Sequence, residues 1–346
     1  MTWTQVLMNW YGENKRDFPW RQSRNPYRVW LSEIILQQTR VQQGLPYFNS
    51  FIQHFPTVYD LANASEESVL KLWQGLGYYS RARNLHATAK WIVQYNDGIF
   101  PTTFKELLTL KGVGDYTASA IASICYEEEQ AVVDGNVYRF LSRYFGIETP
   151  IDHSSAHAIF KKIANDLMKG TLPGDFNQAL MEFGSLQCTP KQTDCNSCPF
   201  SKECVAFQQG KVADFPIKKR ATKVRERHFN YLVFEDTKQK TILLKREQNG
   251  IWKNLYEFPL IETPKKISKK ALISHPDYLK YYPETSRKIS AINSSPIKHL
   301  LSHQRLWISF WKVNLECELE EALDFTQVKA LPVPVVIQDF IEKELH

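Results

Sequence analysis

The periodicity of apolar residues changes near residue 220, and this change constrains the fold more than any other feature of the sequence. Before it, apolar side chains recur at helical spacing, and after it they alternate or run together with β-branched and aromatic residues, as in strands. We therefore expect a mainly α domain over residues 1–210, a basic linker over 211–227, and a smaller α+β domain over 228–346. The helical stretches are expected at 26–38, 45–54, 66–73, 81–95, 104–109, 115–125, 136–145, 154–168 and 176–184, and the later elements are strands at 228–235, 241–246 and 304–313 with a helix near 268–280.

Length and composition agree with two soluble domains. The chain has 346 residues, of which 43% are hydrophobic and 23% charged, an ordinary globular balance. It contains no apolar run near the roughly 18 residues that a membrane span needs, and the first twenty residues lack the features of a signal peptide. We therefore expect no membrane association and a place in the cytoplasm.

Positive charge is concentrated in one part of the chain. Residues 201–300 contain 21 Lys and Arg against 10 Asp and Glu, whereas residues 1–200 contain 18 against 19. The excess is densest over residues 211–227. Such a segment suits a polyanion such as nucleic acid, although most charged runs are simply solvated surface.

Four of the six cysteines are clustered. Cys188, Cys195, Cys198 and Cys204 follow the spacing C-x6-C-x2-C-x5-C, whereas Cys125 and Cys317 stand alone. In a reducing compartment, such a cluster indicates a metal site more often than disulfides. Tetrathiolate zinc sites commonly use two C-x2-C pairs, of which only one is present, and four ligands from one short segment favour a [4Fe–4S] cluster. The spacing alone leaves zinc open.

A glycine-rich hairpin precedes the stretch 115–125. Gly112 and Gly114 in Lys111-Gly112-Val113-Gly114 permit positive φ and close approach of the backbone to another molecule, and free amides at a helix start attract anions. The segment is therefore a candidate for gripping a DNA phosphate. An ordinary connection between two helices is the alternative.

Two carboxylates are candidates for chemistry. Glu33 lies in an apolar helical stretch, where Trp30, Gln37 and Arg40 are expected on the same stripe, and burial raises the pKa of a carboxyl so that it stays protonated near neutrality. Asp134 precedes a helix, where cap amides are expected to hold its pKa low. Taken alone, each is more often a surface Glu or a structural cap.

Together, these motifs occur in the same order in one superfamily. The chain resembles the helix–hairpin–helix DNA glycosylases and, within them, the MutY family of adenine glycosylases, which act on adenine paired with 8-oxoguanine. The matching segments are Phe18-Pro19-Trp20-Arg21, residues 31–39, 75–84 and 110–118, Asp134-Gly135-Asn136-Val137, residues 176–181 and the cysteine spacing.

The resemblance implies roles for individual residues. Glu33 would protonate N7 of an extruded adenine, and Asp134 would stabilise the sugar cation, as in retaining glycosidases. Asn136 and Tyr116 would orient the water and the carboxylates. The adenine pocket would be lined by Trp20, Arg21 and Gln178.

The same resemblance implies the contacts with double-stranded DNA and the cofactor. Gln38, Leu76 and Tyr78 would form a wedge beside the lesion. The hairpin would hold a phosphate, and the cysteines would bind a [4Fe–4S] cluster in a monomeric enzyme. The implied DNA-binding residues are Gln38, Thr39, Leu76, Tyr78, Lys111, Gly112, Gly114, Ser302 and His303, and the implied cluster ligands are Cys188, Cys195, Cys198 and Cys204.

The C-terminal half resembles the MutT (Nudix) domain of these enzymes. Residues 250–259 are similar to the G-x-W-x-x-x-(W/Y)-E-F-P segment, but the Nudix box is missing, which implies 8-oxoguanine binding without pyrophosphate hydrolysis. The Phe-Ser-His tip of the family corresponds here to Leu301-Ser302-His303.

Three rival functions are less consistent with the residues. Endonuclease III-like lyases, which act on oxidised pyrimidines, have a nucleophilic Lys where this chain has Tyr116, so we expect a monofunctional glycosylase. A non-enzymatic DNA-binding or cluster-carrying protein would not need Glu33 and Asp134 together. A Nudix hydrolase would need the missing box.

Overall fold

The computed structural model describes residues 1–219, 224–281 and 289–345. Contacts within the chain divide it into two compact units, of which the first comprises Met1–Asn63 with Asn84–Arg220 and the second comprises Ala64–Arg83 with Ala221–His346. The stretch Ala64–Arg83 thus groups with the C-terminal half, and not with the helical stretches that flank it in the sequence.

Polar contacts explain this grouping. In helix α5 (Glu66–Leu72), the Glu67 carboxylate accepts a hydrogen bond from the Tyr256 hydroxyl at 2.6 Å. Lys71 donates to the carbonyls of Lys329 and Leu331 at 2.6 and 3.0 Å. These partners lie far away in the sequence, so no local pattern in residues 64–83 predicts the contacts.

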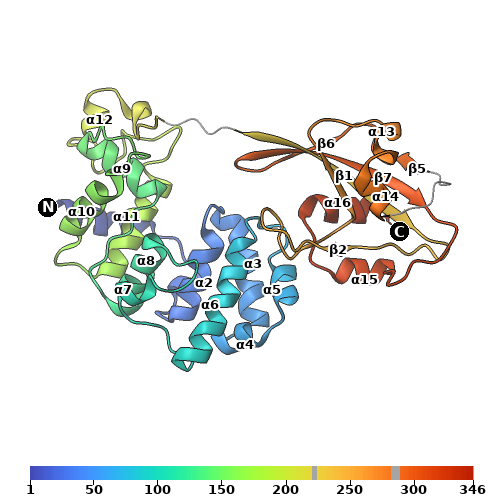
Figure 1. The fold of residues 1–346 in the computed structure, drawn as a ribbon. Coiled ribbons are helices and arrows are strands. Elements are labelled where there is room, and N and C mark those ends of the chain that lie inside the picture. Colours follow the sequence, from blue (N-terminus) through green and yellow to red (C-terminus); the bar gives the residue numbers. More distant parts are fainter. Residues whose placement is uncertain (220–223, 282–288, 346) are drawn as a thin grey trace. The chain divides into compact units, whose positions relative to one another are not determined.

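The first unit is helical (Figure 1). Its core joins α1, α8, α9, α10 and α11 through buried side chains that include Leu7, Phe140 and Phe183. Its helices are α1 (Trp3–Asn14), α2 (Pro26–Leu36), α3 (Val41–His54), α4 (Val58–Asn63), α6 (Ser80–Asn96, which starts in the second unit), α7 (Phe104–Leu107), α8 (Asp115–Tyr126), α9 (Gly135–Phe145), α10 (Ala156–Met168), α11 (Pro173–Leu186) and α12 (Val205–Gln208), with 3-10 turns η1 (Pro19–Arg21) and η2 (Val212–Asp214).

Helix α2 is shorter than the expected stretch 26–38. The Asn25 side chain caps it and Pro26 occupies its first turn, as the sequence indicates. It ends at Leu36 because Gln37 leaves the helical region and Gln38 takes a φ of 55°. The expected stripe through Gln37 and Arg40 is therefore wrong beyond Glu33.

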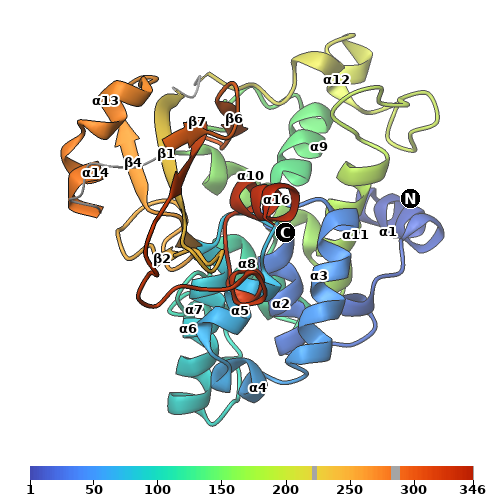
Figure 2. The ribbon, with the colours of Figure 1, turned by 90° about the vertical axis from the view of Figure 1, so that its right-hand side faces the viewer.

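The second unit contains a sheet with the strand order β4-β1-β7-β5, and β6 also pairs with β7 (Figure 2). The long strands β1 (Arg225–Glu235) and β7 (Gln304–Asn314) are parallel, and β4 (Leu260–Thr263), β5 (Ile289–Ala291) and β6 (Ile297–Leu300) are antiparallel to their partners. The expected strand at 241–246 is only β2 (Leu244–Lys245), which pairs with β3 (Tyr256–Glu257). Besides α5, the described part of this unit contains the helices α13 (Lys269–Ile273), α14 (Pro276–Tyr281), α15 (Phe325–Ala330) and α16 (Val335–Glu344).

The fold class is as predicted, with a mainly α first part and an α+β second part. The helix expected near 268–280 is present as the pair α13 and α14. Among the described residues, no helix is both long and apolar enough to span a membrane.

Candidate active site

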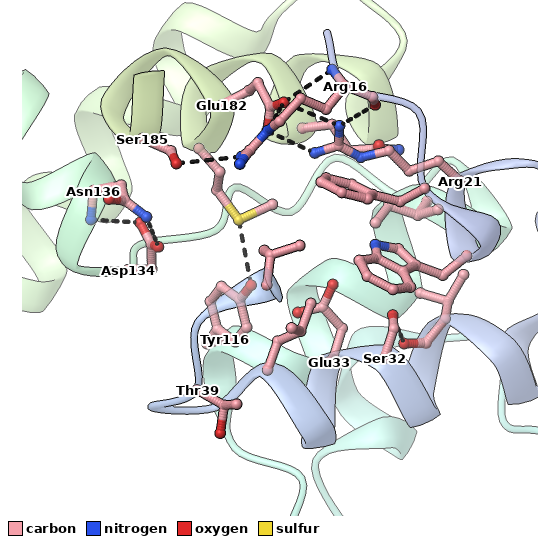
Figure 3. A pocket seen from close by; sticks show the side chains of 18 residues that line it. Arg16, Arg21, Ser32, Glu33, Thr39, Tyr116, Asp134, Asn136, Glu182 and Ser185 are labelled. Carbon is pink, nitrogen blue, oxygen red and sulfur yellow. Dashed lines mark hydrogen bonds and ion pairs between the residues drawn. The ribbon is translucent and has the colours of Figure 1, made fainter. Parts of the chain in front are cut away.

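A cavity of about 180 Å³ in the first unit collects most of the predicted catalytic residues (Figure 3). It lies between α2, the loop before η1, and the starts of α8, α9 and the middle of α11. Eight of the predicted site residues line it: Trp20, Arg21, Glu33, Thr39, Tyr116, Asp134, Asn136 and Gln178.

Glu33 projects from α2 into this cavity and is only 7% exposed. Loss of water is the main cause that raises the pKa of its carboxyl to about 7, and the negative charge of Asp134 adds to the rise. A hydrogen bond from Tyr116 and the positive charge of Arg21 act in the opposite direction, but they are weaker. The carboxyl is therefore a proton donor that is half ionised near neutrality.

Asp134 is the N-cap of α9. Its Oδ1 accepts hydrogen bonds from the backbone amides of Asn136 and Val137 at 2.9 and 2.8 Å, and its Oδ2 accepts one from the Asn136 side chain at 2.8 Å. The expectation that these donors would hold its pKa low is wrong in direction, because burial raises the pKa of Asp134 and the three hydrogen bonds oppose the rise only in part.

Asn136 connects this carboxylate to α11. Its side-chain oxygen accepts a hydrogen bond from Arg139 at 2.9 Å, and the Arg139 guanidinium also donates to the carbonyls of Gly184 and Cys188. A Cβ at Gly184 would lie 2.7 Å from that of Asn136, so α11 can approach α9 this closely only because residue 184 is glycine. The packing fixes the position of the cap.

Tyr116 reaches the cavity from the first turn of α8. Its one hydroxyl proton has two acceptors within reach, the Met181 sulfur at 3.3 Å and the Glu33 carboxylate, and it is donated to one of them at a time. Burial and the two neighbouring carboxylates raise its pKa well above the ordinary value, so the phenol stays neutral.

Sequence reasoning missed Glu182, a third carboxyl of the cavity, which is 2% exposed. Burial would raise its pKa, but hydrogen bonds from Arg16 at 2.7 and 2.9 Å and from Arg21 at 2.9 Å outweigh burial and lower the pKa to about 2. The matched segment 176–181 stops one residue short of it. Its spacing of four from Gln178 on α11 was the available signal.

The predicted phosphate-binding hairpin is largely exposed and packs against α6. Gly112 has a φ of 81°, and a Cβ there would lie 2.7 Å from that of Asn84 on α6. The Thr88 hydroxyl donates to the Lys111 carbonyl at 2.7 Å. Gly114 is the extended N-cap of α8 and no side chain caps this helix start, which leaves amides available to an anion.

The remaining predicted DNA contacts are divided between the units. Gln38 is exposed after α2 in the first unit. In the second unit, Leu76, Tyr78, Ser302 and His303 line another cavity of about 550 Å³, where the hydroxyls of Tyr78 and Ser302 form a hydrogen bond. Tyr78 is 46% exposed whereas Leu76 is 6% exposed, so Tyr78 is the aromatic side chain presented at this surface.

The four clustered cysteines line one small cavity of the first unit, which also contains Arg143. All four thiols are free, and the Arg143 guanidinium donates to the Cys188 sulfur at 3.4 Å. Within the described ranges, no group of three or more His, Cys, Asp or Glu side chains is arranged to hold a metal ion. The donor set of four soft sulfurs around one space nevertheless fits an iron–sulfur cluster.

Known proteins resemble both halves of the chain. The family profile described as HhH-GPD superfamily base excision DNA repair protein matches residues 31–166, and that of the NUDIX domain matches residues 230–343. The adenine DNA glycosylase of Buchnera aphidicola subsp. Baizongia pistaciae is 34% identical over 307 residues, which cover 88% of this chain and 84% of that protein. The chain belongs to the adenine DNA glycosylase family.

Solved structures of two other DNA repair enzymes have a similar fold over part of the chain. A thermostable thymine-DNA glycosylase has a TM-score of 0.56 and 28% identity, and the match covers 60% of this chain and 95% of that one. Endonuclease III in a non-covalent DNA complex has a TM-score of 0.52 at 20% identity, with 61% and 99% covered, which supports the fold.

Opposite pKa shifts predict opposite stability effects for two Glu→Gln substitutions. Because folding raises the pKa of Glu33, ionisation costs stability as pH rises from about 4.5 towards 7. We therefore expect Glu33→Gln to gain stability relative to the wild type by roughly 2–4 kcal/mol between pH 4.5 and 8.

Glu182→Gln is the matched comparison. Because folding lowers the pKa of Glu182, its ionised form contributes stability above the unfolded pKa, and this contribution is lost as pH falls towards 2. The substitution should therefore destabilise the protein at pH 7, and this loss should shrink as the medium is acidified. Thermal unfolding across this pH range measures both variants, and parallel pH profiles would contradict the assignment.

Proposed function

We propose that this chain is a monofunctional adenine DNA glycosylase that removes adenine paired with 8-oxoguanine or guanine in double-stranded DNA. The observation that supports this most directly is that two carboxyls, the buried Glu33 and the partly buried Asp134, lie on one cavity of the first unit. The reaction is hydrolysis of the N-glycosidic bond of an extruded nucleotide, a step of base excision repair.

Each carboxyl has a separate task. Protonated Glu33 gives its proton to N7 of adenine, so that the base leaves as a neutral molecule and the electrons of the glycosidic bond pass into the ring. Ionised Asp134 faces the positive charge that develops on the sugar. Although burial raises the pKa of Asp134, a neighbouring cation favours its anion, so its charge is most stable when it is needed.

Neighbouring side chains position the two carboxyls and the water. Asn136 holds one oxygen of Asp134, and Tyr116 is hydrogen-bonded to Glu33. Water attacks the sugar after the base has left, and its proton passes to a carboxylate. General acid catalysis contributes about 10²–10⁴-fold, so stabilisation of the cation contributes much of the remaining acceleration.

The base would lie against a rigid wall. Trp20 stacks on Phe18 at a centroid distance of 4.9 Å and meets Phe48 edge to face at 5.1 Å. Arg21 is fixed by Glu182, and Gln178 accepts a hydrogen bond from the Tyr11 hydroxyl at 3.3 Å. The wall supplies an aromatic face together with hydrogen-bonding groups, as purine recognition requires.

The lyase chemistry of endonuclease III is not supported by this cavity. A Schiff base needs an amine beside the sugar, and Tyr116 offers a neutral phenol instead. Lys111 is exposed on the hairpin and is not among the residues that line the cavity. The product is therefore an intact strand with an abasic site.

We further propose that Ser302 and His303, exposed in the turn between β6 and β7, read 8-oxoguanine together with Tyr78. The Tyr78–Ser302 hydrogen bond supports this by joining the two implied DNA-contacting segments within one unit. Pyrophosphate hydrolysis is not proposed, because the Nudix box is absent between Glu247 and Gly250. Leu301 replaces the aromatic tip of the family, which reduces the stacking surface.

We also propose that Cys188, Cys195, Cys198 and Cys204 hold a [4Fe–4S] cluster. When bound, such a cluster supplies cross-linking of the loop and one-electron redox chemistry, neither of which the base-release step uses. Arg143 donates to the Cys188 sulfur at 3.4 Å and to the Thr189 carbonyl at 2.7 Å, so it holds the start of the loop in place.

The first experiment tests base release. Duplexes with A opposite 8-oxoguanine, A opposite G, or thymine glycol are incubated with enzyme, and strand breaks are measured before and after hot alkali. We expect strand breaks at A only after alkali. The single-turnover rate of base release should fall as pH rises through about 7, because Glu33 loses its proton. Glu33→Gln should lower this rate by about 10²–10⁴-fold. The exposed Glu13→Gln serves as the control. Cleavage at thymine glycol without alkali would instead indicate a lyase.

A second experiment tests lesion reading. Ser302→Ala/His303→Ala should lower the preference for A opposite 8-oxoguanine over A opposite G by about fivefold per lost hydrogen bond. The rate of base release at saturating enzyme should change less. Ser294→Ala, in the exposed segment before β6, is the matched control. An unchanged preference would remove Ser302 and His303 from lesion recognition.

A third experiment tests the cofactor. The purified chain should contain about four irons and four acid-labile sulfides, and Cys198→Ser should lose them along with visible absorbance. Cys125→Ser and Cys317→Ser should retain the full content, because these two thiols lie outside the cluster. One zinc per chain in place of iron would show that the site is a tetrathiolate zinc site.

A further inference from the structure

The turn that presents Ser302 and His303 lies at one end of the C-terminal sheet. Strand register aligns Thr263 of β4, His228 of β1, Trp307 of β7 and Lys298 of β6 in one row across the sheet. From this row, β4 and β6 both run toward the start of β1 and β7. The chain after Thr263 and the β6–β7 turn therefore leave the sheet at the same end (Figure 2).

Cations gather at this end. Arg225 opens β1, and its backbone N–H donates to the His303 carbonyl at 3.0 Å. Lys265 and Lys266 follow β4, and Lys298 lies in β6 with its ammonium 5.9 Å from the centroid of the Trp307 ring. All four side chains are exposed. We call Arg225, Lys265, Lys266 and Lys298 the basic end of the sheet.

The acidic residues nearby do not neutralise the basic end. Glu262 forms an ion pair with Arg227 at 2.6 Å, and Glu226 forms one with Arg305 at 2.6 Å. Within the part of the chain that the structure describes, no ion pair involves Lys265, Lys266 or Lys298. The charge excess noted in residues 201–300 therefore includes paired cations, which hold the fold together, and unpaired ones, which face solvent.

The other end of the same sheet differs. Lys312, near the end of β7, pairs with Glu235 at 2.9 Å, and Lys238, in the turn after β1, pairs with Glu318 at 2.8 Å. Unpaired positive charge is therefore distributed unequally between the two ends of the sheet. It is concentrated where the β6–β7 turn projects.

We propose that the basic end binds the phosphodiester backbone of the duplex that flanks the base read by the β6–β7 turn. The inference rests on the proposed function and adds a second contact to it. Three strand spacings separate β4 from β6, about 14 Å, and double-stranded DNA carries one charge per ~1.7 Å of axis, so the row spans several phosphates. Such contacts fix the register of the protein on DNA without reading sequence.

Two matched triple variants test the proposal. Lys265→Gln/Lys266→Gln/Lys298→Gln removes charge from the basic end, and Lys238→Gln/Lys240→Gln/Lys312→Gln removes the same charge from the opposite end of the same sheet. Both are made in the Glu33→Gln background so that the base stays in place. Binding to duplexes with A opposite 8-oxoguanine, and to undamaged duplexes, is measured by fluorescence anisotropy at several salt concentrations.

We expect only the first triple variant to change the salt dependence. Loss of three phosphate contacts should reduce the slope of log K against log salt by about 2.7, so that the affinity lost between 50 and 200 mM salt is roughly 40-fold smaller. At low salt, the first triple variant should lose as much affinity for the undamaged duplex as for the duplex with A opposite 8-oxoguanine. Thermal unfolding checks that both variants are folded.

Three results would overturn the proposal. Equal slope changes in both triple variants would show an effect of net charge alone. An unchanged slope in the first variant would show that the basic end does not touch DNA and would leave it for an acidic protein partner. A loss confined to the 8-oxoguanine duplex would assign these lysines to lesion reading. Because binding is measured without base release, failure of the proposed function would appear separately, in the wild-type cleavage assay.

Discussion

The removal of the Glu33 carboxyl from water is the interaction on which the candidate active site depends. Water stabilises a carboxylate strongly, and its loss raises the pKa of Glu33 to about 7. The apolar side chains around the cavity, which come from α2, α8 and α11 among others, exclude the water. Packing of these helices and the weak acidity of Glu33 therefore have the same origin. A cavity with the same residues but open to water would contain three ionised carboxylates and no acid at neutral pH.

Three carboxyls on one cavity show that surroundings decide what a residue does. Glu33 has few donors and holds its proton up to about pH 7, Asp134 is partly buried and accepts three hydrogen bonds, and Glu182 is paired with two arginines and is ionised. The first suits proton transfer and the second suits stabilisation of a cation. The third holds Arg21 and Arg16 in place and has no free position for a proton.

Local features of the site could be predicted from the sequence, and features set by distant contacts could not. The Asp134 cap, the positive φ of Gly112 and the grouping of four cysteines depend on nearby residues and agree with expectation. The direction of the Asp134 pKa shift depends on burial in the folded chain, and the pairing of Glu182 depends on Arg16 and Arg21, more than 150 residues earlier. The grouping of 64–83 with the second unit depends on partners beyond residue 240. A local reading of the sequence weighs the hydrogen-bond donors next to a residue but not the solvent that folding removes.

The guanidinium of Arg139 makes the reaction centre sensitive to the cysteine loop. One side chain donates to the Asn136 oxygen, to the Gly184 carbonyl and to the carbonyl of Cys188, where the loop begins. If the loop shifts, Arg139 must give up a partner, and the amide that orients Asp134 is then free to rotate. A disturbance of the loop, such as oxidation of its thiols, would therefore loosen the Asp134 carboxylate, although no cysteine lines the candidate active site.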